Sequence, residues 1–330
     1  MKKMNLPAQS FLLGIGLMCL SVVVMCRASD TNFAPPWQHG ANSDVLDRGL
    51  IFTEPDADNL ADLHGSPLQP KLSLYVGGNY FFAMAPLVAE FEHEHPEYLG
   101  KLYWETLPPG LLIRQIRNGG TITVGNMTLT VPADVYLAGI GRVQSGVTEK
   151  WLDAPVVCYA TNTLTMMIAK GNPKHIMSLM DLSRADVRLA MPNPAYEGIA
   201  RQIKQSLIQA GGEKLDQAVY DLKVGQGSTL LTHIHHRQTP LWIMQGKVDA
   251  GVTWLSEAIF QESVGHPIGH VAIPNQFNVH AVYAGALVHG ALHREAGKLW
   301  LQFMNSKQAQ SILHRYGFAT YAAEKEVSGH

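Results

Sequence analysis

The amino-acid sequence predicts an α/β protein made of two doubly wound lobes joined by a two-segment hinge. Strand-like and helix-like patterns alternate from Lys71 to Tyr316, which favours parallel sheets covered by helices on both faces. One series of patterns ends in the apolar run 160–169, and a second begins after the turn 170–173. The order of the elements therefore assigns residues 71–159 and 276–330 to lobe 1 and residues 160–275 to lobe 2.

Hydrophobic periodicity places the elements of lobe 1. The run Leu72–Val76 reads as a strand, and an apolar-periodic helix follows it through Phe91 and ends before Pro96. The further elements expected in this lobe are a strand at 102–106, a helix at 111–116, a hairpin at 121–131 with its turn at 125–126, a strand at 134–139 and closing helices at 295–304 and 307–316.

The second series has the same alternation. We expect strands at 187–191, 220–224, 250–254 and 271–274, helices at 199–210 and 239–245, and the returning strand at 280–288. The strand before the hinge stops at Lys170-Gly-Asn-Pro173, because glycine permits positive φ and proline cannot donate to a sheet.

The composition and the N-terminus limit the function. The chain of 330 residues is 46% hydrophobic with a formal net charge of -2, which describes a globular protein and gives no reason to expect nucleic acid as a partner. Residues 1–28 carry a short basic start and an apolar run from Phe11 to Cys26, so we expect an export signal and a soluble mature protein starting near Ser29. A membrane anchor is the alternative, although the run is short for a span of about 20 apolar residues.

Two further features concern the chain that remains after residues 1–28 are removed. Residues 29–70 read either as an extended arm that packs on the body or as a disordered leader, since their composition has no clear period. Once residues 1–28 are removed, Cys158 is the remaining cysteine, and one cysteine cannot form an internal disulfide. The mature protein should therefore depend on its hydrophobic core, and we expect a monomer.

Two candidate binding loops belong to lobe 1. The first contains Gly78, Asn79 and Tyr80, directly after a strand and before a helix, where backbone N–H groups and the helix dipole favour an anion. A simple tight turn is the alternative. The second contains Arg142 after two glycines; its guanidinium could bind an oxyanion, or it could be a solvated surface residue.

Lobe 2 supplies the other candidates. Tyr196, Glu197 and Gly198 lie at an expected helix start, where an Asn-Pro turn could also serve only as a cap. The segment His233-Ile-His235-His236-Arg237 is a dense group of donors just before another helix. It is consistent with anion binding, a structural loop or a metal site, although no Cys, Asp or Glu ligand lies beside it. We expect no metal and no cofactor.

The stretch from Ala160 to Leu182 resembles the point where periplasmic solute-binding proteins of the molybdate-binding type cross between lobes. The resemblance covers roughly residues 71–320 and implies a type II periplasmic binding protein fold. It also implies a periplasmic location, an ABC permease as partner and a small anionic solute as ligand. Two sites depart from the family: Gly77-Gly78-Asn79 replaces a hydroxyl pattern, and Trp254 stands where the family has a tyrosine after Asp-Ala-Gly.

We therefore expect a transport protein and not an enzyme. Trp254 and Tyr196 would form an apolar wall, which leaves room for an organic anion in place of a molybdate-like oxyanion. A sensory protein of the same fold is a further alternative. A metal-dependent hydrolase using the His233, His235 and His236 cluster is another, although the sequence lacks the Gly-x-Ser-x-Gly, His-Glu-x-x-His and P-loop motifs.

Overall fold

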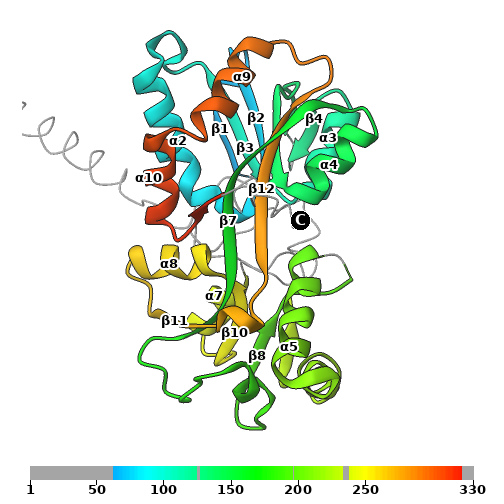
Figure 1. Ribbon diagram of the computed structural model, residues 1–330, viewed down its shortest axis with the longest axis vertical. Helices are drawn as coiled ribbons and strands as arrows, with labels where there is room; N and C mark the ends of the chain where they lie inside the picture. Colours follow the sequence, from blue (N-terminus) through cyan, green and yellow to red (C-terminus); the bar gives the residue numbers. More distant parts are fainter. Residues whose placement is uncertain (1–61, 125–126, 196, 233–237, 322–330) are drawn as a thin grey trace, which may run out of the picture.

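The computed structural model describes residues 62–124, 127–195, 197–232 and 238–321. Within these ranges the strands form one 11-stranded sheet and a separate two-stranded hairpin. Figure 1 shows two α/β lobes, one above the other, with β7 (Leu152–Ala169) and β12 (His280–Val288) running between them. The two-lobed α/β architecture predicted from the sequence is confirmed.

Lobe 1 is a mixed sheet with helices on both faces. Its strands follow the order β1 (Asp62–Gly65), β3 (Leu102–Leu107), β2 (Leu72–Gly77), β6 (Val135–Gly139), β12 and β7. Successive residues of β2 alternate between two hydrophobic clusters, with Leu74 and Val76 in one and Tyr75 in the other. The first cluster is covered by α2 (Phe81–Glu94), α9 (Arg294–Phe303) and α10 (Lys307–Arg315), and the second by α3 (Pro109–Arg117) and α4 (Ile140–Thr148).

Lobe 2 has the same layered construction. Parallel strands β9 (Thr229–Leu231), β8 (Leu189–Met191) and β10 (Ala250–Trp254) lie side by side, and the second part of β7 pairs antiparallel with β10 and with β11 (Ile268–Ala272). One face packs against α5 (Gly198–Gln217). The other packs against α7 (Gln238–Met244) and α8 (Leu255–Ser263), as Figure 1 shows.

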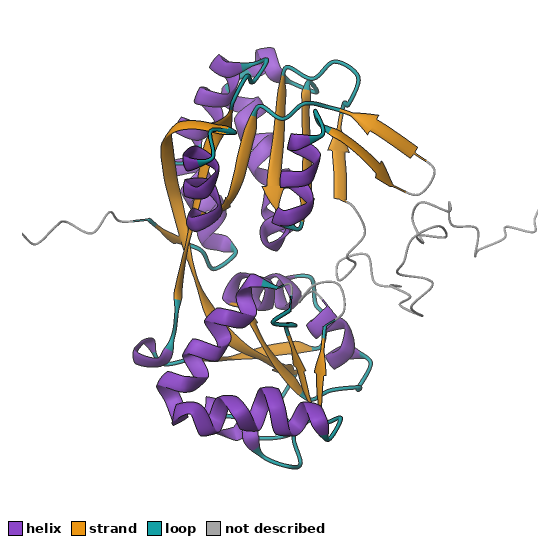
Figure 2. Cartoon of the chain, turned by 90° about the vertical axis from the view of Figure 1, so that its right-hand side faces the viewer, coloured by secondary structure: helices purple, strands orange, loops and turns teal. Residues whose placement is uncertain are grey.

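The two connections between the lobes are bonded to each other. Residues 152–163 of β7 pair with β12 in lobe 1, and residues 164–169 continue into the sheet of lobe 2. On the returning segment, the Asn278 amide accepts from Leu164 N (2.9 Å) and donates to Leu164 O (2.8 Å). The Asn278 side chain thereby takes the place of a backbone partner for Leu164. Figure 2 shows the two crossings between the lobes at one edge of the molecule.

Most expected elements are present. The hairpin of β4 (Thr121–Val124) and β5 (Met127–Thr130) pairs in the predicted register, with Thr123 opposite Thr128; its turn lies outside the described residues. The arm before Lys71 contains β1, which pairs antiparallel with β3 at the edge of the sheet. The remaining short elements are β13 (Ala319–Thr320) and the helices η2 (Gly78–Tyr80), η3 (Pro96–Tyr98), η4 (Leu179–Ser183) and η6 (Asn275–Phe277).

The expected strand at 220–224 is wrong. The chain there is helical, with η5 (Ala218–Leu222) and α6 (Lys223–Gly225), and the edge strand of lobe 2 is β9 instead. Apolar residues at 215, 219 and 220 fit one helix face as well as a strand, and Lys223 is fixed by donating to the carbonyls of Arg184 (2.6 Å) and Val187 (2.5 Å). The sequence reading also missed α4 and α8, and it placed β11 three residues too late.

Candidate functional site

The strand directions make the loops of the two lobes face each other. β7 runs from lobe 1 into lobe 2 and β12 runs back. Because β6 is antiparallel to β12 and parallel to β2, the carboxyl ends of β2, β3 and β6 point toward lobe 2. Because β10 is antiparallel to β7 and parallel to β8, the carboxyl ends of β8, β9 and β10 point toward lobe 1. Ligands of α/β sheets bind at this end of the strands.

Helices begin directly at these strand ends. β6 ends at Gly139 and α4 begins at Ile140, while β10 ends at Trp254 and α8 begins at Leu255. Neither capping residue makes a side-chain hydrogen bond to its helix. Helix starts from opposite lobes therefore direct backbone N–H groups and positive dipole ends toward the same region, which favours a bound anion.

The first loop divides its side chains between the core and the site. Asn79 is half-buried, and its Nδ2 donates to Tyr283 Oη (2.6 Å) on β12. Tyr80 is 1% exposed and shares a 2.6 Å hydrogen bond with Tyr159 Oη, so its hydroxyl is engaged by the core. Burial raises the pKa of Tyr80 and of Tyr283, so both hydroxyls stay neutral at physiological pH. Gly78 is buried at the start of η2.

Arg142 lies in the first turn of α4 and is exposed. Its charge is close enough to Tyr136 to act against the pKa increase that burial causes in that tyrosine. Because α4 begins at the carboxyl end of β6, Arg142 lies on the side of lobe 1 that faces lobe 2.

In lobe 2, Glu197 is the capping residue of α5 and is 8% exposed. Its carboxylate accepts from Asn193 N (3.1 Å) and from the Thr232 hydroxyl, so it connects the loops after β8 and β9. Gly198, the first residue of α5, is exposed, and its Cβ position is open space. Tyr196, His235, His236 and Arg237 lie outside the described residues.

Trp254 is buried at the end of β10, and its ring packs edge-on against Tyr283 (6.4 Å between centroids). Helix α8, which follows it, touches lobe 1 through Phe260. That ring stacks on Phe82 (4.8 Å) and meets Phe81 edge-on (5.2 Å), both from α2. The start of α8 is therefore held against lobe 1 by apolar contacts.

Sequence reasoning missed three polar residues near these loops. Asn162 on β7 donates to Ser256 Oγ (2.8 Å) in the first turn of α8, and Tyr283 on β12 accepts from Asn79. A weak signal was available, because Asn162 is an amide inside an otherwise largely apolar strand. Its partner lies 94 residues away, which no local pattern indicates.

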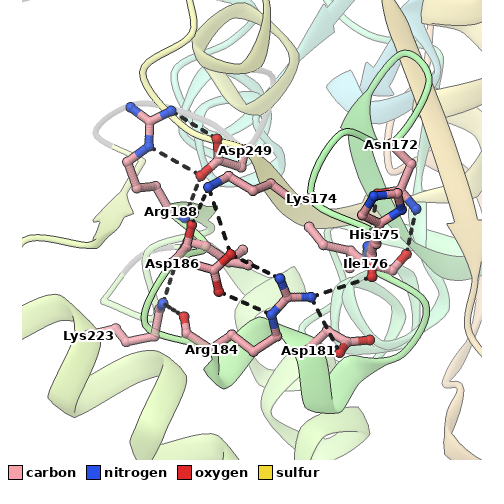
Figure 3. Close-up of polar contacts among 11 residues, drawn as sticks. Asn172, Lys174, His175, Ile176, Asp181, Arg184, Asp186, Arg188, Lys223 and Asp249 are labelled. Carbon is pink, nitrogen blue, oxygen red and sulfur yellow. Dashed lines mark hydrogen bonds and ion pairs between the residues drawn. The ribbon is translucent and has the colours of Figure 1, made fainter.

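A cluster of paired charges lies away from the candidate site. Figure 3 shows Arg188 paired with Asp249 (2.9 Å) and Arg184 paired with Asp186 (2.9 Å). Arg188 and Asp249 directly precede β8 and β10, so the cluster lies at the opposite end of the strands from the candidate site. Burial raises the pKa of Asp249, but the hydrogen bonds from Arg188 outweigh it and the pKa is lowered. These charges compensate one another and point to no ligand.

No group of three or more His, Cys, Asp or Glu side chains is arranged to hold a metal ion in the described part of the chain. No helix in that part has the length and apolar character to cross a bilayer.

A protein-family model described as bacterial extracellular solute-binding protein matches residues 72–319. The chain belongs to this family. Its relatives include the molybdate-binding protein of Mycobacterium tuberculosis, 25% identical over 214 residues (64% of this chain and 75% of the relative). The sulfate-binding protein of Synechococcus elongatus is 23% identical over 200 residues (58% of this chain and 56% of the relative).

Solved structures agree on the fold. The sulfate-binding protein of M. tuberculosis superimposes with a TM-score of 0.61 at 20% identity (75% of this chain, 85% of that one). The molybdate-binding protein of Azotobacter vinelandii gives 0.60 at 17% (76% and 100%), and Peb3 of Campylobacter jejuni with bound L-phospholactate gives 0.58 at 16% (76% and 100%). The fold is the type II periplasmic binding protein fold. The chain is a solute-binding protein of the ABC transporter type, from an extracellular family.

Proposed function

We propose that this protein captures a small anion between its two lobes and delivers it to an ABC permease in the periplasm. The observation that carries the proposal is the arrangement of helix starts. α4 in lobe 1 and α8 in lobe 2 begin directly at strand ends that face each other, and α5 begins after the loop that follows β8. Backbone N–H groups and helix dipoles stabilise an anion without a counter-charge. The molybdate- and sulfate-binding relatives support the same class of solute.

The residues proposed to line the site come from both lobes. Gly78 and Asn79 belong to the first loop and Arg142 to the start of α4, while Gly198 is the first residue of α5. Lobe closure would bring these groups onto one solute, with bending near residues 164 and 278, where the crossings leave one sheet and enter the other. Closure of this kind excludes water and strengthens the hydrogen bonds to the anion.

An organic anion is a second candidate. Trp254 ends β10 on the side of lobe 2 that faces lobe 1, and its indole packs on Tyr283. An apolar side chain at this strand end favours a ligand with a carbon skeleton. The L-phospholactate bound to Peb3 shows that a related fold accepts such a molecule.

Calorimetric titration with sodium molybdate, sodium sulfate and L-phospholactate at fixed ionic strength tests the proposal. We expect one of the three to bind with 1:1 stoichiometry. Gly198→Asp adds a carboxylate at the start of α5, where the Cβ meets open space, so the fold should tolerate it while affinity falls about ten-fold or more.

Gly225→Asp is the matched control. It adds the same charge to the same lobe at another open position, in the connection that leads into β9 at the opposite end of the strands. Affinity should change less than about two-fold, since the added charge is exposed at the far end of the strands and is screened by salt. Equal losses in both variants would show a general charge effect. Unchanged affinity in Gly198→Asp would remove α5 from the site.

A further inference from the structure

Tyr283 lies where the two lobes and both crossings meet. It is on β12, is 2% exposed, and packs edge-on against three other rings. Two of them, Tyr80 (5.3 Å) and Phe318 (5.6 Å), belong to lobe 1, and Trp254 (6.4 Å) belongs to lobe 2. This packing fixes the ring, and with it the position of the hydroxyl oxygen.

The hydroxyl oxygen of Tyr283 accepts a short hydrogen bond from the first loop. Asn79 Nδ2 donates to it over 2.6 Å. Burial raises the pKa of Tyr283, so the hydroxyl stays neutral at physiological pH and accepts from the amide as a phenol.

A second hydrogen bond links the neighbouring crossing strand to lobe 2. Asn162 Nδ2 on β7 donates to Ser256 Oγ (2.8 Å) in the first turn of α8, and its Oδ1 accepts from Thr163 N (2.9 Å). Each crossing strand therefore carries one side chain that bonds near the site, Tyr283 on β12 to Asn79 and Asn162 on β7 to Ser256. These four side chains are neutral, so they impose orientation without adding charge to the site.

We propose that Tyr283 is a positioning residue of the solute site, whose hydroxyl holds the Asn79 amide of the first loop in the orientation that an anion requires. The inference rests on the proposed anion site. Because one amide N–H is held by the hydroxyl, the amide plane is fixed, and its Oδ1 lies 3.5 Å from the position that a Cβ on residue 77 would occupy.

The test compares two buried tyrosine hydroxyls. Tyr283→Phe removes the central hydroxyl and keeps the ring. Tyr159→Phe removes a hydroxyl at a residue 1% exposed, whose partner is Tyr80 Oη and not Asn79. We expect affinity for molybdate or sulfate to fall about ten-fold in Tyr283→Phe and less than about two-fold in Tyr159→Phe, with similar shifts in melting temperature.

A double-mutant cycle separates positioning from a general structural role. In an Asn79→Ala background, Tyr283→Phe should lower affinity by less than about two-fold, since the group it positions is gone. Full additivity of the two losses would overturn the inference. So would equal effects of the two tyrosine variants.

Hydrogen exchange of the free protein tests the positioning role without an anion. Exchange should accelerate at residues 78–81 in Tyr283→Phe, while residues 255–257, where Asn162 keeps its bond to Ser256, should not change. If the wild type binds neither molybdate nor sulfate, the anion proposal fails, and exchange decides the positioning role: acceleration at 78–81 supports it, and unchanged exchange there overturns it.

Discussion

Glu105 gives the stability of lobe 1 a predictable dependence on pH. This carboxyl on β3 has no exposed surface; Tyr103 Oη donates to it over 2.7 Å and Gln115 Nε2 over 3.2 Å. Burial raises the pKa of Glu105 to about 7, although these two hydrogen bonds act in the opposite direction. The folded protein therefore holds a proton on Glu105 that the unfolded chain, with an ordinary pKa of 4.5, releases.

This difference in pKa makes the free energy of unfolding depend on pH. Between pH 4.5 and about 7 the folded state binds more protons than the unfolded state, so the free energy of unfolding falls as pH rises. The contribution is complete below 4.5 and is lost as pH rises through about 7. A difference of about 2.5 pKa units corresponds to about 3 kcal/mol.

Urea unfolding of the wild type and of Glu105→Gln, followed by tryptophan fluorescence from pH 4.5 to 7.5, measures this contribution. The stability difference between the two proteins should change by about 3 kcal/mol across the range, because glutamine does not titrate. Glu149→Gln is the control, since this exposed carboxylate pairs with Arg117 at the surface and should follow the wild type. Parallel curves for wild type and Glu105→Gln would refute the reasoning.

Two further predictions concern the crossings and the sheet of lobe 2. Asn278→Ala removes both bonds to Leu164 and should lower the free energy of unfolding by about 1 to 3 kcal/mol, with faster hydrogen exchange at residue 164; unchanged exchange there would contradict the bridging role. Gly251→Ala would place a Cβ 2.3 Å from Ala190 O and 2.5 Å from Thr239 Cγ2, so it should destabilise the protein by about 1 to 3 kcal/mol, whereas Gly269→Ala, with an ordinary contact at 3.8 Å, should cost less. Thermal melts of the two glycine variants distinguish these outcomes.

The sequence determined the two-lobed order of elements and the loops at the strand ends. Apolar periodicity and the Lys170-Gly-Asn-Pro173 turn are local properties, and they located β2, α2, β10 and β12 nearly to the residue. At residues 220–224 one local pattern fitted both a strand and a helix, and the prediction of a strand was wrong. Packing against the rest of lobe 2 selects the helix there.

The tertiary structure alone decided which side chains serve the site. Tyr80 and Asn79 are neighbours in sequence, yet one hydroxyl is bound within the core and the other side chain reaches β12. Asn79 and Tyr283 are 204 residues apart. Their hydrogen bond exists because β12 returns from lobe 2 beside β6 and brings Tyr283 to the end of β2, a contact set by sheet topology and by the packing of both lobes.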